Sequence, residues 1–133
     1  MLSIFPDLLT YNLLGITIIR VVLGLMAMYL GLKLLKKRQA LIDYITLIKM
    51  PFAKIAPWLI FVTLELAGIF MLIGLYTQVM AIVLAFLFLK VLFIDTVTNK
   101  SVGYNNIVYL AFILISLSFL FLGPGAFAFD LPL

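Results

Sequence analysis

The sequence contains no cysteine and no histidine. Without cysteine there can be no disulfide, no thiolate nucleophile and no cysteine-ligated iron–sulfur cluster. Without histidine, the usual protein ligands of haem, copper and catalytic zinc are also missing. We therefore expect no metal site and no cofactor bound covalently or by cysteine or histidine. We also expect that the chain does not catalyse a reaction alone.

Charged side chains are scarce as well. They make up 11% of the 133 residues, whereas hydrophobic residues make up 67% and the mean hydropathy is +1.35. A soluble domain carries roughly 25% charged residues, because most of the surface of a small globule faces water. The composition therefore predicts an integral membrane protein whose partner is the lipid bilayer. Its length fits a single membrane domain over residues 1–133.

Four apolar stretches are long enough to cross a bilayer as helices, which takes ~20 residues each. Helices suit this environment because they form every backbone hydrogen bond internally. The stretches show no strand-like alternation of apolar and polar residues, which argues against a barrel. We predict an all-α, polytopic membrane protein, built as an antiparallel bundle of four transmembrane helices over residues 13–32, 57–76, 78–94 and 105–122.

Two short segments predict where helices end. Only a few residues around Thr77 separate the second and third spans, so these spans should be antiparallel neighbours. Gly123, Pro124 and Gly125 should stop the fourth helix, because proline lacks a backbone donor and glycine favours non-helical angles. The tail beyond them is expected to place three apolar side chains along the outer interface: Phe127, Phe129 and Leu131.

The long link between the first two spans has two interpretations. Leu41, Ile42, Ile45 and Ile48 recur at helical spacing with polar residues between them. This pattern predicts an amphipathic helix that lies in the membrane interface. The alternative is an irregular basic loop.

The positive charges are gathered on one side of the predicted bundle. The first link and the third link share that side, and the other side carries no lysine or arginine. Cytoplasmic loops carry the excess of such residues, so we expect a multi-pass protein of the cell membrane with both termini outside. The cations do not alternate with exposed aromatic residues, so no nucleic-acid partner is expected. The cations of the two links are Lys33, Lys36, Lys37, Arg38, Lys49, Lys54 and Lys100.

Three charged residues lie inside the predicted spans: Arg20, Glu65 and Lys90. A charge at the centre of a bilayer costs roughly 2.5–3.5 kcal/mol, so such residues usually face the bundle interior and pair. At ~1.5 Å per residue, Glu65 lies ~10 Å, Lys90 ~8 Å and Arg20 ~19 Å from the cytoplasmic boundary. Glu65 therefore matches Lys90 in depth and reaches Arg20 only if both side chains extend. Lys90 could instead extend to the interface.

Polar and small residues share faces on the predicted helices. On the first helix Arg20 shares a face with small residues that favour close packing. On the second helix Glu65 and Gly68 share a face. We propose a polar cluster within the membrane, or alternatively a purely structural ion pair. The residues of the cluster hypothesis are Arg20, Glu65, Lys90, Tyr29, Tyr109 and Asn105, and the helix-packing residues are Gly24, Ala27, Gly31 and Gly68.

Several short motifs occur in a definite order along the chain. They are Arg20 in the first span, residues 29–33 (YLGLK), residues 65–68 (ELAG), residues 74–77 (GLYT), residues 123–125 (GPG) and Asp130. In this order, on four apolar spans, they resemble the DoxX family of small four-helix membrane proteins. The resemblance implies association with redox systems. Some relatives are membrane subunits of a thiosulfate:quinone oxidoreductase, and others work with soluble redox partner proteins.

Three functions are compatible with these features. The first is a membrane subunit of an oxidoreductase assembly that offers a docking surface or binds a quinone or other lipid-like molecule, with Arg20 and Glu65 lining the site. The second is a pathway for a small solute or a proton, which would need a homo-oligomer because one protomer has few helices. The third is a structural membrane module.

The distribution of loop cations generates a prediction about topology. A reporter inserted near Arg38 should be inaccessible from outside intact cells, whereas a tag after Leu133 should be accessible, because lysine and arginine favour the cytoplasmic side. Protease or antibody accessibility in intact and permeabilised cells measures both positions. A C-terminal tag that is reached only after permeabilisation would contradict the predicted orientation.

Overall fold

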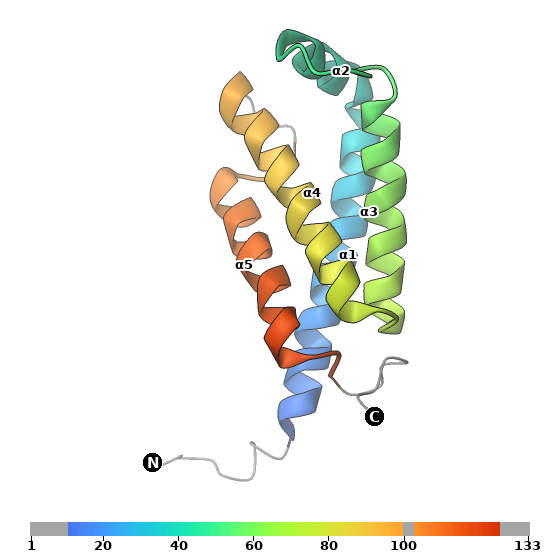
Figure 1. Cartoon of the computed structure of the whole chain (residues 1–133), viewed down its shortest axis with the longest axis vertical. Helices are drawn as coiled ribbons and strands as arrows, with labels where there is room; N and C mark the ends of the chain where they lie inside the picture. The colour runs from blue at the N-terminus through green and yellow to red at the C-terminus, as the bar shows by residue number, and fades with distance from the viewer. Residues whose placement is uncertain (1–10, 100–102, 126–133) are drawn as a thin grey trace.

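Five α-helices make up the part of the chain that the structure describes. The computed structural model describes residues 11–99 and 103–125. The helices α1, α3 and α4 are long and apolar enough to cross a membrane, and α5 is a shorter apolar helix. The predicted all-α membrane bundle is confirmed (Figure 1). The bounds are α1 (Asn12–Lys36), α2 (Arg38–Leu47), α3 (Ala56–Ile73), α4 (Thr77–Thr98) and α5 (Asn106–Leu122).

Two helices end at residues other than those predicted for the spans, and single residues explain the differences. The second span was predicted to reach residue 76, but α3 ends at Ile73 because Gly74 adopts a left-handed backbone with φ of 78°. The third span was predicted to end at residue 94, but α4 continues to Thr98, since the polar Asp95 is buried within the bundle. As predicted, α5 stops at Leu122, before Gly123. The predicted tail contacts of Phe127, Phe129 and Leu131 lie outside the described residues.

The helix predicted in the first link is confirmed. It is α2, which turns Leu41 and Ile45 into the bundle and leaves Arg38, Asp43 and Thr46 exposed. It lies across one end of the molecule, where it packs on α1, α3 and α4 (Figure 1). The alternative of an irregular basic loop is wrong for this segment.

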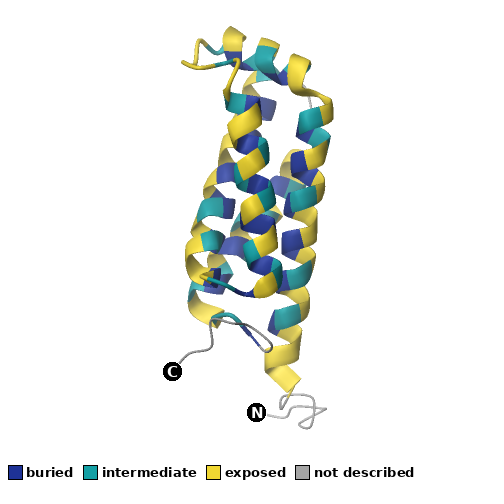
Figure 2. Ribbon diagram, turned by 90° about the vertical axis from the view of Figure 1, so that its right-hand side faces the viewer, coloured by how far each residue is buried: buried dark blue, intermediate teal, exposed yellow. Residues whose placement is uncertain are grey.

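The long helices are arranged as two closely packed pairs. α1 packs mainly along α3, and α4 packs mainly along α5. α3 and α4 are joined by a turn at residues 74–76 and contact each other less extensively. Buried residues lie on the sides of the helices that face other helices, whereas residues on the outward sides are exposed (Figure 2). Those outward faces carry large apolar side chains such as Leu25, Leu66 and Phe86. An apolar outer surface of this kind suits lipid and not water.

The backbones of α1 and α3 approach each other closely at two glycines. A Cβ atom placed on Gly24 would lie 2.9 Å from the carbonyl oxygen of Gly68, and a Cβ on Gly68 would lie 2.9 Å from that of Gly24. The same Cβ on Gly68 would lie 2.6 Å from Cγ of Met28. Only glycine fits at these two positions, so the backbones of α1 and α3 meet directly here. Ala27 is also fully buried on this face of α1.

Hydrogen bonds from side chains to backbone carbonyl groups connect elements at both ends of the bundle. At the α2 end, Nζ of Lys33 donates a hydrogen bond to the carbonyl oxygen of Gly103 at 2.8 Å. The first and third links therefore share one side, as the sequence predicts. At the opposite end, Nε2 of Gln78 donates to the carbonyl oxygen of Leu120 at 3.1 Å. Which end faces the cytoplasm stays a prediction from the loop cations.

The glycine contact generates a test of this packing. Gly68→Ala should lower the stability of the bundle by about 1–3 kcal/mol, because the added methyl group forces α1 and α3 apart. The matched control is Gly15→Ala, since a Cβ at Gly15 meets no atom within 4 Å. Thermal unfolding in detergent measures both variants. Equal melting temperatures for Gly68→Ala and Gly15→Ala would show that the helices do not meet at these glycines.

Candidate functional site

Arg20 is buried near the end of the bundle that lies opposite α2. Only 1% of its surface is exposed, and Nη1 donates a hydrogen bond to the carbonyl oxygen of Pro124. Pro124 belongs to the short segment that follows α5 and returns to α1. A Cβ on Gly125 would lie 3.0 Å from Thr17 Oγ1, so this segment packs tightly on α1. The carbonyl group of Pro124 thus gives the buried guanidinium of Arg20 a hydrogen-bond acceptor.

Glu65 lies on α3 and faces the first helix. A Cβ on Gly31 would lie 2.9 Å from Oε1 of Glu65, so Gly31 leaves the space that this carboxyl group occupies. Oε1 is buried and accepts no hydrogen bond from the residues that the structure describes. Glu65 is therefore packed between α1 and α3 without a polar partner for this oxygen.

The structure does not bring Glu65 together with Arg20 or Lys90. Gly31 follows Arg20 by eleven residues, so Glu65 lies roughly 16 Å along α1 from the level of Arg20. Within residues 11–99 and 103–125, no ion pair links Glu65 to either cation. The physical reason is that Arg20 has another acceptor, the Pro124 carbonyl, which becomes available only when the segment after α5 folds back.

Aromatic side chains and one lysine form a second cluster at the α2 end. Nζ of Lys33 lies 5.9 Å from the ring centre of Tyr29 and 5.4 Å from that of Tyr104. The backbone N–H of Tyr104 donates to the hydroxyl of Tyr109 at 2.9 Å. The hydroxyl of Tyr104 donates to the carbonyl oxygen of Met26 at 3.4 Å, and burial raises the pKa of this hydroxyl above its ordinary value. This cluster joins α1 to α5 and to the loop before it.

The predicted residues Tyr29 and Tyr109 both belong to this aromatic cluster, whereas Asn105 does not. Asn105 is exposed at the N-terminal end of α5, and its side chain makes no capping hydrogen bond. The sequence prediction missed Lys33 and Tyr104 as members of the cluster. Tyr104 directly follows Gly103 in a polar link, and only the path of that link over α1 places its ring beside Lys33.

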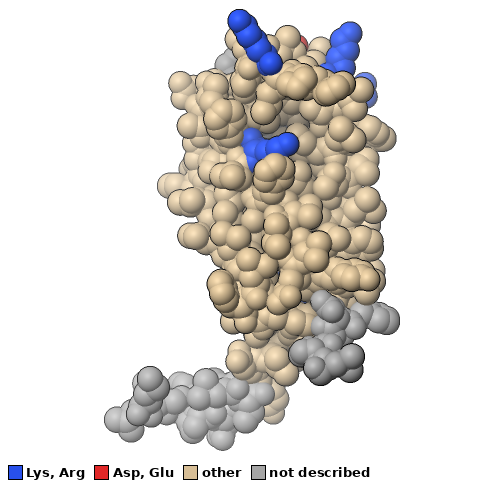
Figure 3. Space-filling model, viewed as in Figure 1, with Lys and Arg blue, Asp and Glu red and all other residues tan. Residues whose placement is uncertain are grey.

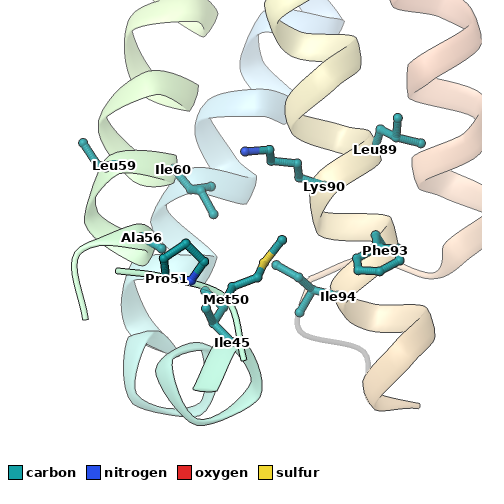
Figure 4. A pocket seen from close by; sticks show the side chains of 10 residues that line it. All are labelled: Ile45, Met50, Pro51, Ala56, Leu59, Ile60, Leu89, Lys90, Phe93 and Ile94. Atoms are coloured by element: carbon teal, nitrogen blue, oxygen red, sulfur yellow. The ribbon is translucent and has the colours of Figure 1, made fainter. Parts of the chain in front are cut away.

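An apolar groove lies between α3 and α4 below α2. Its volume is about 540 Å³, and among the described residues that line it Lys90 is the only charged one. Figure 4 shows Lys90 extending from α4 into the groove toward Ile60 of α3. The lining residues are Ile45 from α2, Met50 and Pro51 from the link, Ala56, Leu59 and Ile60 from α3, and Leu89, Lys90, Phe93 and Ile94 from α4.

The groove continues along the same two helices. A second hollow of about 390 Å³ shares Leu59, Ile60 and Lys90 with the first and adds Thr63 and Phe86. Nζ of Lys90 lies 4.8 Å from the ring centre of Phe86. Together the two hollows form one apolar groove, which we call the α3–α4 groove, with Lys90 at its middle. Within the described residues no three carboxylate side chains gather at a site that could hold a metal ion.

Comparison with known proteins identifies the family. The DoxX family model matches residues 15–100, which is well over half of the chain. This protein belongs to the DoxX family. No curated protein and no solved structure matches the chain. The matched segment contains Arg20, Lys33, Glu65 and Lys90 and ends before α5.

The motifs that resemble DoxX proteins meet one another in space. In the ELAG motif, Glu65 faces Gly31 of the YLGLK motif, and Gly68 faces Gly24. Lys33 of the YLGLK motif reaches the loop before α5. The GPG motif supplies the carbonyl group that accepts the hydrogen bond from Arg20. These motifs therefore join α1 to α3 and to the segments on either side of α5.

The sequence prediction missed most of the groove. Phe86 and Phe93 lie in a span but gave no signal that separated them from other apolar residues. Met50 and Pro51 belong to the link, whose path was not predicted. The one signal that pointed to the groove was Lys90, as a charge within a span.

The separation of Arg20 and Glu65 generates a prediction about their energetic coupling. In a double-mutant cycle, Arg20→Leu and Glu65→Leu should change the unfolding free energy additively, within about 0.5 kcal/mol, because the two residues share no partner. The control pair is Lys33→Met and Tyr104→Leu, which should couple by about 0.5–2 kcal/mol through the cation–π contact. Thermal unfolding in detergent reports both cycles. Strong coupling of Arg20 and Glu65 with none between the control pair would contradict the arrangement described here.

Proposed function

We propose that this DoxX protein is a membrane subunit of an oxidoreductase assembly, which binds a quinone or a similar lipid-like molecule and carries no redox centre of its own. The observation that supports this proposal is the α3–α4 groove with Lys90 at its middle. Its two hollows, about 540 and 390 Å³, are within the range of roughly 300–1,000 Å³ that small-molecule sites usually have.

The chemistry of the groove fits a quinone. A quinone offers an apolar ring, an apolar chain and carbonyl oxygens that accept hydrogen bonds. The lysine ammonium group of Lys90 is a donor with three N–H bonds and no acceptor. Phe86 and Phe93 offer aromatic surfaces beside it, and aromatic rings attract one another in offset or edge-on geometry. The remaining lining is almost entirely aliphatic, so only one end of the ligand needs a polar group.

The proposed site differs from the one expected from the sequence. Arg20 and Glu65 were expected to line it, but Arg20 is bound to the Pro124 carbonyl and Glu65 lies against Gly31. Neither residue lines the α3–α4 groove. We therefore assign the ligand-binding role to Lys90 and place Arg20 among the residues that hold the fold together.

A subunit of this kind needs a partner protein that holds the redox centre. The sequence supplies no cysteine or histidine for such a centre, so electrons would pass between the bound quinone and the partner. Transport is supported less well. Arg20, Glu65 and Lys90 occupy three separate surroundings in one protomer, so they do not form a relay.

The proposal predicts where a quinone binds. A photoreactive quinone analogue, added to the protein in lipid nanodiscs, should label residues of the α3–α4 groove, and an excess of unmodified quinone should prevent the labelling. Lys90→Met should weaken binding about tenfold or more, since a hydrogen bond to a charged group contributes about 1.5–3 kcal/mol. Mass spectrometry of peptides locates the label.

The matched control for this experiment is Lys37→Met, which removes an exposed lysine at the junction of α1 and α2. It should leave the labelling unchanged. Labelling spread evenly over the apolar helices, or equal labelling of both variants, would refute quinone binding in the groove. Mass spectrometry of proteins and small molecules that copurify from native membranes tests the assembly separately.

A further inference from the structure

The link between α2 and α3 combines exposed apolar and exposed basic side chains. Leu47, at the end of α2, is 76% exposed, Phe52 is 75% exposed and Ile55 is 52% exposed. Lys49 and Lys54 stand among them and are exposed as well. No acidic residue occurs between Leu47 and Ile55. Water disfavours these apolar side chains, and hydrocarbon disfavours the two lysines, so neither medium alone suits this surface.

The backbone holds this segment in a defined path. Two residues after the end of α2, Lys49 has a left-handed backbone conformation with φ of 57°. The N–H of Met50 donates to the carbonyl oxygen of Ile45 at 3.3 Å, and that of Lys49 donates to Thr46 at 3.1 Å. This pair of hydrogen bonds is the Schellman motif, in which glycine usually occupies the position of Lys49.

A second left-handed residue follows three positions later. Phe52 has φ of 61°, which is rare for a bulky side chain. Its carbonyl oxygen accepts hydrogen bonds from the N–H groups of Ile55 and Ala56, at 3.0 and 2.9 Å. The turn thus leads directly into α3. A bulky residue keeps such a conformation only where the surrounding structure determines it, so the exposure of Phe52 is built into the turn.

The position of the link indicates what it meets in a membrane. Met50 and Pro51 form part of the wall of the α3–α4 groove, as Figure 4 shows, and α3 and α4 are both long and apolar enough to cross a membrane. α2 lies beyond the link at the end of the bundle (Figure 1). Basic side chains stand out at this end, and most of the face below them is uncharged (Figure 3). The link therefore lies where hydrocarbon gives way to lipid headgroups.

We propose that this link binds an anionic phospholipid, whose phosphate group contacts Lys49 and Lys54 and whose acyl chains contact Leu47, Phe52 and Ile55. We assign an anionic lipid to this link because of charge complementarity: the link contains two lysines and no acidic residue. Basic residues next to a membrane helix attract anionic headgroups. The proposal concerns residues outside the Lys90 contact, so it stands whether or not the groove binds a quinone.

The test compares two double variants that lose the same charge. Lys49→Gln with Lys54→Gln removes the proposed phosphate contacts. Lys36→Gln with Lys37→Gln removes two lysines at the junction of α1 and α2. Each full-length protein is placed in nanodiscs that contain equal amounts of phosphatidylglycerol and phosphatidylcholine. After release from the nanodiscs, native mass spectrometry counts the lipids of each kind that stay bound.

The wild-type protein should retain phosphatidylglycerol in preference to phosphatidylcholine. The Lys49/Lys54 variant should lose this preference by about 30-fold, which is about 2 kcal/mol at roughly 1 kcal/mol per lysine. The Lys36/Lys37 variant should keep it. Equal loss in both variants would show that the field of the whole basic end attracts the lipid, and no preference in the wild type would show that no such site exists. Either result overturns the proposal.

Phe52→Ser supplies a second measurement that does not depend on charge. It should reduce the retention of both lipids, because it removes the apolar contact and keeps both lysines. Unchanged retention in Phe52→Ser would refute the part of the proposal that concerns the acyl chains. A thermal unfolding curve of each variant shows whether it folds.

Discussion

The direct contact between Gly24 of α1 and Gly68 of α3 is the constraint on which the rest of the fold depends. Apolar helices gain little from leaving lipid for one another, because hydrocarbon is as apolar as their side chains. Close packing must then hold them, and it is tightest where no side chain separates the backbones. Once α1 and α3 are fixed, Gly31 lies opposite Glu65.

Two basic residues of α1 then attach the second helix pair to the first. Lys33 donates to the Gly103 carbonyl, in the loop before α5, and Arg20 donates to the Pro124 carbonyl, in the segment after α5. The two contacts lie at opposite ends of the bundle and hold α5 at both of its ends. Charges inside a membrane are expensive, but backbone carbonyl groups in the segments before and after α5 accept these hydrogen bonds without an acidic partner. Lys90 is the cation of the spans that has no such structural task, and it lies in the groove.

The sequence was sufficient for the helices and insufficient for the contacts between them. Apolar length predicted the spans, and the spacing of Leu41 and Ile45 predicted α2, because both follow from the local period of a helix. Depth along the helices suggested a partner for Glu65 but could not show that the Pro124 carbonyl would take Arg20. That acceptor exists only after residues 123–125 fold back on α1. The groove could not be predicted from the sequence for a similar reason. Part of its wall depends on the path of the link, and that path requires left-handed backbone conformations at Lys49 and Phe52, which are not glycine.

The groove follows from the way α3 and α4 are connected. A turn of three residues, 74–76, holds the two helices together at one end. At the other end, Figure 1 shows α4 leaning away from α3 toward α5, which is its main packing partner. The α3–α4 groove lies where the two helices diverge. Ile45 from α2 and Met50 and Pro51 from the link line that space at the α2 end. The same divergence that places α4 against α5 thus places Lys90, the charged residue among the described lining residues, between α3 and α4, where we propose that a quinone binds.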